Sequence, residues 1–308
     1  MTAIDPSLDA PQGGQNACTL DVPLDRPARS EERSGESPYL PGVATPRLTG
    51  ERPTPGATPD SLLALHAAGY REVGLRLGRG RVLDAGCGLG FESVSFAGEG
   101  RRVVGVDYDP GAAAQAQHRW EGAGLTAACM DAARLGLSEG SIDWACSSHL
   151  IEHFDRPETH VSEIARVLAP SGTAFFLCPN APADFENPFH VVAFEAADLA
   201  GLLGQFFESV WVGGLDGNPA VKQDIGRRRV KARRVLALDV LGLRRRLPRS
   251  WYISAYTKVL PLAYRLIARG DAGGATGISD NDFFVTDQVD STTLVLFAIV
   301  SNPRRMGR

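Results

Sequence analysis

Short apolar runs alternate with amphipathic segments along most of the chain, and this pattern predicts an α/β fold. Apolar runs of strand length lie at 81–86, 102–107, 125–131, 141–148, 173–180 and 206–214, and a longer one follows at 291–303. Segments with helical signals lie before and between them, at 60–77, 90–97, 110–123, 157–168 and 195–204. Strands that alternate with helices form a mostly parallel sheet covered on both faces. We therefore expect a doubly wound sheet of seven strands, with right-handed crossovers.

This alternation stops in two regions. Residues 1–57 hold about half of the 20 prolines and few large apolar residues, so we expect a disordered or loosely docked tail. Residues 215–290 separate the sixth run from the last by too many residues for a simple connection. We expect a basic, partly helical insertion there, which caps the site. The core domain then spans 58–214, and 291–308 forms the final strand and a tail.

Composition sets outer limits on the function. A chain of 308 residues that is 44% hydrophobic can bury a full core, and its net charge of -4 gives no overall attraction to nucleic acid. The five cysteines include no CxxC pair, which is typical of a reducing compartment. No run reaches the roughly 18 apolar residues of a spanning helix, and the N-terminus has no secretory signal. We expect a cytoplasmic protein.

A basic segment stands out against this acidic average. Residues 222–249 hold eleven Lys or Arg and two Asp, and a stretch rich in aromatic and aliphatic residues follows to about residue 265. Three interpretations remain open: a solvated helical cap over the acceptor site, a pocket for an anionic glycan or lipid, or a surface for an anionic membrane. The last would place 222–265 at the inner face of the membrane. Nucleic acid is disfavoured, because no recognised module accompanies the charge.

The stretch VLDAGCGLG places Gly86, Gly88 and Gly90 directly after the first strand. In a doubly wound sheet this turn lies at the carboxyl ends of the strands, where ligands bind, and glycine lets the backbone approach a ligand closely. The dinucleotide fingerprint GxGxxG needs a glycine where this chain has Phe91. A nicotinamide-dependent oxidoreductase is therefore the weaker alternative.

Acidic residues at three successive strand ends match the polar groups of S-adenosylmethionine, which carries no phosphate. Asp84 suits the cationic amino group of the methionine part. Asp107 can accept from both ribose hydroxyls. Asp131 can accept from the adenine amino group, and Ala132 can supply backbone contacts. The three acids with the glycines are far more specific than any one of them, and they predict an S-adenosylmethionine site.

Four stretches together resemble the successive motifs of class I S-adenosylmethionine-dependent methyltransferases, and within that group the type-11 methyltransferase domain. They are VLDAGCGLG, VVGVDYDP, CMDAARLGLSEGSIDWACSSHLIEHF and VLAPSGTAFFLCPN. The resemblance covers about residues 60–214 plus the last strand, and departs from many relatives at the turn 170–172. It implies a Rossmann-like methyltransferase fold, with His149 and Leu150 on the side where the methyl group is transferred. The cofactor-binding residues that it implies are Asp84, Ala85, Gly86, Gly88, Gly90, Asp107, Tyr108, Met130, Asp131, Ala132, His149 and Leu150.

Three histidines are candidates for the chemistry. Methyl transfer is an in-line displacement, in which the protein positions the reactants and, for a hydroxyl acceptor, often supplies a base. His149 follows the fourth strand, His153 comes one turn later, and His190 lies in a loop expected to cover the acceptor. Each is otherwise a hydrogen-bonded structural imidazole. His160 is expected on a helix surface, and Asp109 is expected to cap the helix that begins at Pro110.

The histidines favour transfer to an oxygen atom of a small-molecule, glycan or lipid-linked acceptor. The nearby acids Asp155, Asp184 and Glu186 match no metal motif, so we expect no metal. A non-catalytic, nucleoside-binding protein at the membrane remains a further alternative. The sequence indicates no oligomeric state.

Overall fold

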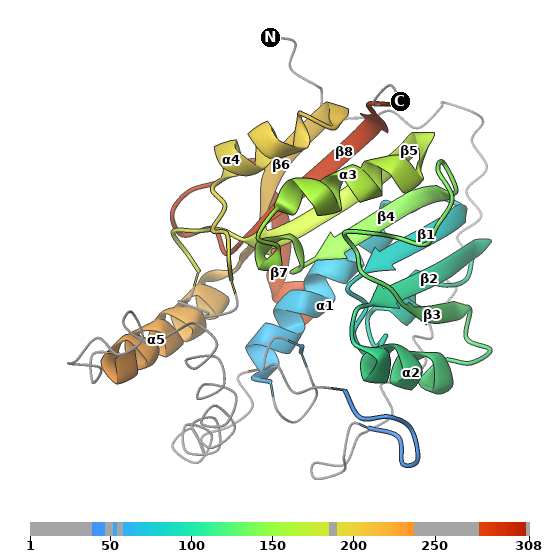
Figure 1. Ribbon diagram of the computed structural model, residues 1–308. Helices are drawn as coiled ribbons and strands as arrows, with labels where there is room; N and C mark the ends of the chain where they lie inside the picture. Colours follow the sequence, from blue (N-terminus) through green and yellow to red (C-terminus); the bar gives the residue numbers. More distant parts are fainter. Residues whose placement is uncertain (1–38, 47–51, 54–57, 185–189, 237–276, 306–308) are drawn as a thin grey trace, which may run out of the picture. The chain divides into compact units, whose positions relative to one another are not determined.

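One mostly parallel sheet of eight strands runs through the part of the chain that the computed structural model describes, residues 39–46, 52–53, 58–184, 190–236 and 277–305 (Figure 1). Its strand order is β3-β2-β1-β4-β5-β8-β6-β7. The strands from β3 to β5 pair in parallel, whereas β8 is antiparallel to β5 and β6, and β7 is antiparallel to β6. The strands are β1 (Gly80–Ala85), β2 (Arg101–Asp107), β3 (Leu125–Cys129), β4 (Ile142–Ser148), β5 (Leu168–Pro179), β6 (Phe207–Gly217), β7 (Phe283–Thr286) and β8 (Val295–Pro303).

Helices pack on both faces of this sheet through two apolar clusters. Neighbouring residues of a strand point to opposite faces, so Val82 belongs to one cluster and Leu83 to the other. Side chains of α3 and α4 belong to the cluster that contains Leu83, and side chains of α1 and α5 belong to the cluster that contains Val82. The helices are α1 (Asp60–Gly74), α2 (Pro110–Arg119), α3 (Pro157–Val167), α4 (Ala196–Leu203) and α5 (Pro219–Leu236).

The predicted fold class is confirmed, but the count of seven strands is one too low. The extra strand, β7, lies inside residues 215–290, which were expected to form the cap. It has four residues with acids on both sides, Asp282 and Asp287, so it is too short to give an alternating pattern. Antiparallel pairing with β6 at the sheet edge defines β7, and no alternating pattern in its own sequence does so.

Two further local predictions are wrong. The helix expected at 90–97 is only a 3₁₀ helix, Ser93–Phe96, because glycines at positive φ limit it on both sides, Gly90 (φ 75°) and Gly98 (φ 91°). The turn expected at 170–172 lies within β5 instead. There the pairing of β4 steps from Leu168 to Thr173 while β4 itself advances by two residues, so the intervening residues form a bulge.

Part of the N-terminal segment is docked on α2. The side-chain oxygen of Gln115 accepts from the Leu40 amide at 2.7 Å, and its side-chain amide lies within hydrogen-bonding distance of the carbonyls of Leu40, Val43 and Ala44. Asp109 caps the same helix by accepting from the Ala112 amide at 2.9 Å, as predicted. Within residues 1–57 the structure describes 39–46 and 52–53, and the rest of this segment lies outside the described residues.

Candidate active site

The glycine-rich loop leaves β1 at the centre of the sheet and is held by the neighbouring strand. The amides of Gly86 and Cys87 both donate to the Val106 carbonyl, at 2.8 and 3.0 Å. Gly86 has φ 85°, and a Cβ added there would lie 3.3 Å from the side chain of Leu150. Only glycine fits this conformation and this spacing without strain. The loop therefore lies directly against the segment that follows β4.

Asp84 lies beneath this loop and is fully buried. The Tyr70 hydroxyl is 3.1 Å from both carboxylate oxygens, and the Ser93 hydroxyl bonds Oδ2. Burial raises the pKa of Asp84 to about 7, although the two hydroxyl bonds act in the opposite direction and lower it. Asp84 thus joins β1, α1 and the 3₁₀ helix under the loop, and it has its own donors within the protein.

Asp107 ends β2 beside the loop. Its Oδ2 accepts from the Gly88 amide at 3.0 Å and its Oδ1 from the Asp109 amide at 2.9 Å. The Arg52 guanidinium also donates to Oδ1, at 3.2 Å. Arg52 also lies over Gly88, where an added Cβ would be 3.2 Å from its Cδ. Sequence analysis missed Arg52, because no local pattern in the proline-rich segment marks it.

The third strand end lies next to Asp107, since the Met130 amide donates to the Asp107 carbonyl at 3.0 Å. Asp131 is exposed, and its Oδ1 accepts from the Ala133 amide at 2.8 Å. Ala132 is buried, whereas Tyr108 is 59% exposed. The predicted cofactor residues of the three strand ends therefore share one edge of the sheet.

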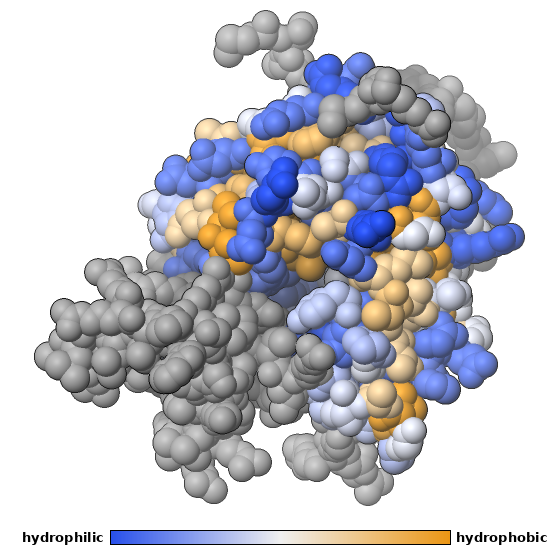
Figure 2. Space-filling view, in the orientation of Figure 1, coloured by the Kyte–Doolittle hydropathy of each residue, from blue (hydrophilic) through white to orange (hydrophobic). Residues whose placement is uncertain are grey.

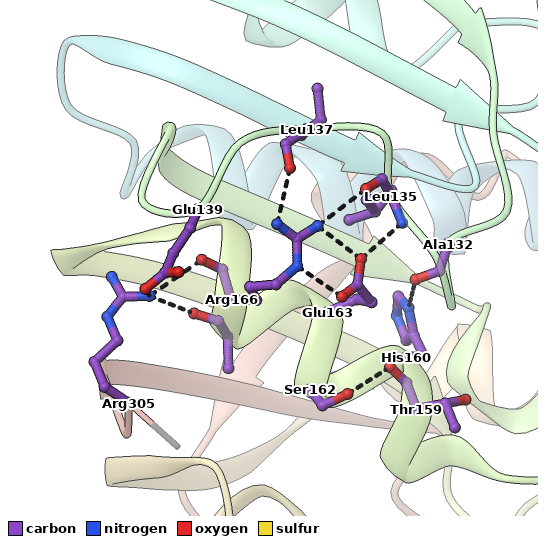
Figure 3. A network of polar contacts seen from close by, with 11 residues as sticks. Ala132, Leu135, Leu137, Glu139, Thr159, His160, Ser162, Glu163, Arg166 and Arg305 are labelled. Carbon is purple, nitrogen blue, oxygen red and sulfur yellow. Dashed lines mark hydrogen bonds and ion pairs between the residues drawn. The ribbon is translucent and has the colours of Figure 1, made fainter. Parts of the chain in front are cut away.

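His160 supports this edge of the sheet by a hydrogen bond to Ala132. The prediction that His160 lies on a helix surface is wrong. It is fully buried on the apolar face of α3, one residue before Val161. Its Nδ1 donates to the Ala132 carbonyl at 3.0 Å (Figure 3). Its Nε2 therefore accepts from the Ser147 hydroxyl at 2.8 Å. Burial lowers its pKa to about 4, against the opposing effect of the Ala132 bond. His160 is a neutral structural imidazole.

His149 follows β4 in a strained conformation. Its φ is 51°, in the left-handed region that few non-glycine residues adopt, and its amide donates to the Leu177 carbonyl at 2.8 Å. The ring of His66 lies 4.3 Å from that of His149. Burial, and then the neighbouring His149, hold the pKa of His66 well below 6.5. His66 was not predicted, because on α1 it matches an ordinary helix position.

A second group lies one turn further along. His153 and His190 have ring centroids 5.2 Å apart, and Asp184 Oδ2 is 2.6 Å from His190 Nδ1. Glu152 lies between these side chains and His149, with Oε1 3.6 Å from His149 Nδ1. All three predicted catalytic histidines thus lie around Glu152, which sequence analysis did not single out.

The residues of the loop fit S-adenosylmethionine better than a dinucleotide. Gly86, Gly88 and Gly90 all have positive φ, and they place backbone beside the carboxylate of Asp107. A dinucleotide needs the N-terminus of an α-helix for its pyrophosphate, and this loop leads into a 3₁₀ helix of four residues. The loop therefore matches S-adenosylmethionine, which carries no phosphate.

Comparison with known proteins agrees with this geometry. A family model described as a methyltransferase domain matches residues 83–176. The chain is 34% identical over 163 residues to a protein of Mycolicibacterium smegmatis named as a probable S-adenosylmethionine-dependent methyltransferase, covering 51% of this chain and 63% of that protein. A relative of the same description from Mycobacterium tuberculosis is 32% identical over 193 residues, or 60% of this chain and 69% of that protein. The match thus spans less than two thirds of the Mycolicibacterium relative.

Solved structures show the same fold at low sequence identity. The cyclase SpnF superposes with a TM-score of 0.51 at 16% identity, covering 86% of this chain and 89% of SpnF. A SAM-dependent methyltransferase from Thermotoga maritima gives a TM-score of 0.50 at 15% identity, covering 78% of this chain and 90% of that protein.

Within the described ranges, no helix is long and apolar enough to cross a membrane. The fold, the loop and these relatives together place the chain in the class I S-adenosylmethionine-dependent methyltransferases, as an enzyme that uses S-adenosylmethionine as its cofactor.

Proposed function

We propose that this enzyme transfers the methyl group to an oxygen atom of its acceptor, and that His149 is the base that removes the hydroxyl proton. The observation that carries the proposal is the strained backbone of His149 at the end of β4. Strain of this kind persists where the surrounding structure enforces it, and it is concentrated at active sites. The next residue, Leu150, packs against Gly86 of the glycine-rich loop. His149 is thereby adjacent to the cofactor loop.

The proposed cofactor contacts follow the strand ends. Gly86, Gly88 and Gly90 bring the loop backbone to the methionine part, Asp107 binds the ribose hydroxyls, and Asp131 with Ala132 binds adenine. A carboxylate has about four acceptor positions, and two on Asp107 are used by backbone amides. Two then remain for the two ribose hydroxyls once Arg52 moves aside. Asp84 supports the glycine-rich loop from beneath, because its oxygens already accept hydrogen bonds from Tyr70 and Ser93.

S-adenosylmethionine supplies a methyl carbon bonded to a positively charged sulfur. The acceptor oxygen forms a bond to this carbon while the carbon–sulfur bond breaks, and the electron pair stays on the sulfur. The hydroxyl proton passes to the ring of His149. Glu152, 3.6 Å from His149 Nδ1, stabilises the imidazolium that results. The neighbouring His66 stays uncharged, because burial lowers its pKa well below 6.5.

Transfer of labelled methyl groups to a panel of acceptors tests this proposal. We expect product from phenolic, sugar, carboxylic or lipid hydroxyl acceptors, and His149→Ala should lower turnover by about 10²- to 10⁴-fold, as loss of a general base does. His118→Ala, at an exposed position of α2, is the matched control and should leave turnover unchanged. Transfer to nitrogen, sulfur or carbon acceptors alone would contradict the proposal, as would full activity of His149→Ala.

We also propose that the basic segment 222–265 meets an anionic lipid surface that presents the acceptor. Only its first part, within α5, is described, and there Lys222 pairs with Asp216 at 2.6 Å and Arg227 with Asp224 at 3.7 Å. Figure 2 shows hydrophilic residues over much of the described face, with apolar residues between them. The proposal depends on the charge of the basic segment, eleven Lys or Arg against two Asp over 222–249. Co-sedimentation with phosphatidylserine vesicles at low salt should capture the protein, and high salt should release it. No binding at low salt would refute it.

A further inference from the structure

Three side chains with metal-binding atoms converge beside His149. Glu152 and His153 belong to the 3₁₀ helix Ile151–His153, and His190 lies after β5. One ligand atom from each lies within 4.8 Å of the other two. The chain is folded back to make this contact, because the amides of Val191 and Val192 donate to the Glu152 carbonyl at 2.8 and 3.1 Å. Backbone hydrogen bonds therefore fix the cluster.

The carboxylate of Glu152 points to a missing partner. Glu152 is only 2% exposed, and neither of its side-chain oxygens has a hydrogen-bond partner among the described residues. An ionised carboxylate without hydrogen bonds is costly to bury. In the described part of the chain the carboxylate thus lacks hydrogen bonds and has an ion-pair contact, 3.6 Å from Oε1 to His149 Nδ1, with the imidazoles of His153 and His190 also nearby.

Asp184 prepares His190 for ligation. Its Oδ2 lies 2.6 Å from Nδ1 of His190, so this nitrogen donates its proton to the carboxylate. A histidine that binds a metal through one ring nitrogen almost always donates the other N–H to a carboxylate, a carbonyl or water. The contact fixes the orientation of the His190 ring beside Glu152 and His153. It is a second observation, independent of the three converging side chains.

We propose that Glu152, His153 and His190 bind a divalent transition-metal ion. Two imidazoles and one carboxylate suit Zn²⁺, Mn²⁺, Fe²⁺ or Co²⁺ better than the oxygen-preferring Mg²⁺ and Ca²⁺. Three protein ligands leave coordination positions open. Among the acids considered from the sequence, Asp155 is not part of this cluster, Asp184 acts through His190, and Glu186 lies outside the described residues.

The role of the ion rests on the proposed oxygen acceptor. A hydroxyl bound at an open position would lose its proton more readily, because a bound cation lowers the pKa of an attached oxygen. His149, beside Glu152, would receive that proton. The substrate class that this arrangement selects is an acceptor with oxygen atoms able to ligate the ion.

Titration of the metal-stripped, full-length protein with Co²⁺ tests the site. We expect about one Co²⁺ per chain, with visible absorption typical of nitrogen and oxygen ligands. Glu152→Gln, His153→Ala and His190→Ala should each weaken binding at least tenfold. Asp184→Asn should weaken it by about 10- to 100-fold, as loss of a hydrogen bond to a ligating histidine does. The control His118→Ala should bind as the wild type does.

Absence of stoichiometric Co²⁺ binding by the wild type would overturn the proposal, as would unchanged affinity in His153→Ala and His190→Ala. A parallel titration with S-adenosylmethionine shows that each variant is folded. If a histidine variant fails to fold, the wild-type spectrum and Glu152→Gln still decide. The readout needs no acceptor, so failure of this site and failure of oxygen transfer are observed separately.

Discussion

Two buried carboxylates lie near the carboxyl edge of the same sheet, and the protein treats them in opposite ways. Asp84, on the donor side, is bonded by the hydroxyls of Tyr70 and Ser93, and burial raises its pKa to about 7. Glu152, on the acceptor side, has no hydrogen-bond partner among the described residues, and its pKa lies below the usual value. Asp84 has its hydrogen-bond donors within the protein, and these bonds hold the glycine-rich loop in place. In our proposal, Glu152 takes a metal ion as its further partner.

The pH dependence of stability tests the donor side, and it carries the largest expected effect. Asp84 has a folded pKa near 7 and an ordinary value of 3.8, so the folded state holds its proton more tightly. Its contribution is fully present below about pH 4 and is lost as the pH rises through 7. The loss is on the order of 4 kcal/mol at one pKa unit per 1.36 kcal/mol. Denaturant unfolding of wild type and Asp84→Asn at several pH values measures it. Parallel curves for the two proteins would contradict the assignment.

Matched substitutions at the two carboxylates sharpen the contrast. Asp84→Ala leaves the buried hydroxyls of Tyr70 and Ser93 without their acceptor, and it should cost about 2–4 kcal/mol of unfolding free energy at pH 6. Among the described contacts, Glu152→Gln removes only the 3.6 Å ion-pair contact with His149, so in metal-free protein it should change stability by less than about 1 kcal/mol. Urea unfolding of both variants makes the comparison. Equal destabilisation would mean that Glu152 is structural, as Asp84 is.

The glycine-rich loop with its strand ends and the cluster around Glu152 also differ in how far the sequence could predict them. The glycines, Asp107 and the strand ends could be proposed from the sequence because each carries a local signal, a turn residue or an acid after an apolar run. Glu152 carries none, since a glutamate before a histidine is ordinary, and only the fold-back of Val191 and Val192 brings His190 to it. Arg52 and His66 reach the site from segments distant in sequence. The fold class followed from periodicity, whereas β7 was missed because edge pairing, and no local pattern, defines it.

Arg52 offers a smaller test on the donor side. Its guanidinium occupies an acceptor position of Asp107 that the ribose needs in our proposal. Arg52→Ala should therefore tighten S-adenosylmethionine binding by about two- to fivefold, the equivalent of a partly exposed ion pair of up to about 1 kcal/mol. Arg81→Ala, which loses a pair with Asp143 near the start of β1, is the control. Weaker binding in Arg52→Ala would mean that Arg52 helps to hold the cofactor.

Calorimetric titration with S-adenosylmethionine of the wild type, Asp107→Ala and His149→Ala tests the central division of the site most directly. The account assigns Asp107 to the cofactor and His149 to the acceptor. Asp107→Ala should weaken binding by about 10- to 100-fold, since hydrogen bonds to a charged group contribute about 1.5–3 kcal/mol. His149→Ala should bind within about twofold of the wild type while its turnover falls. Unchanged binding in Asp107→Ala, or an equal loss in both variants, would contradict the account.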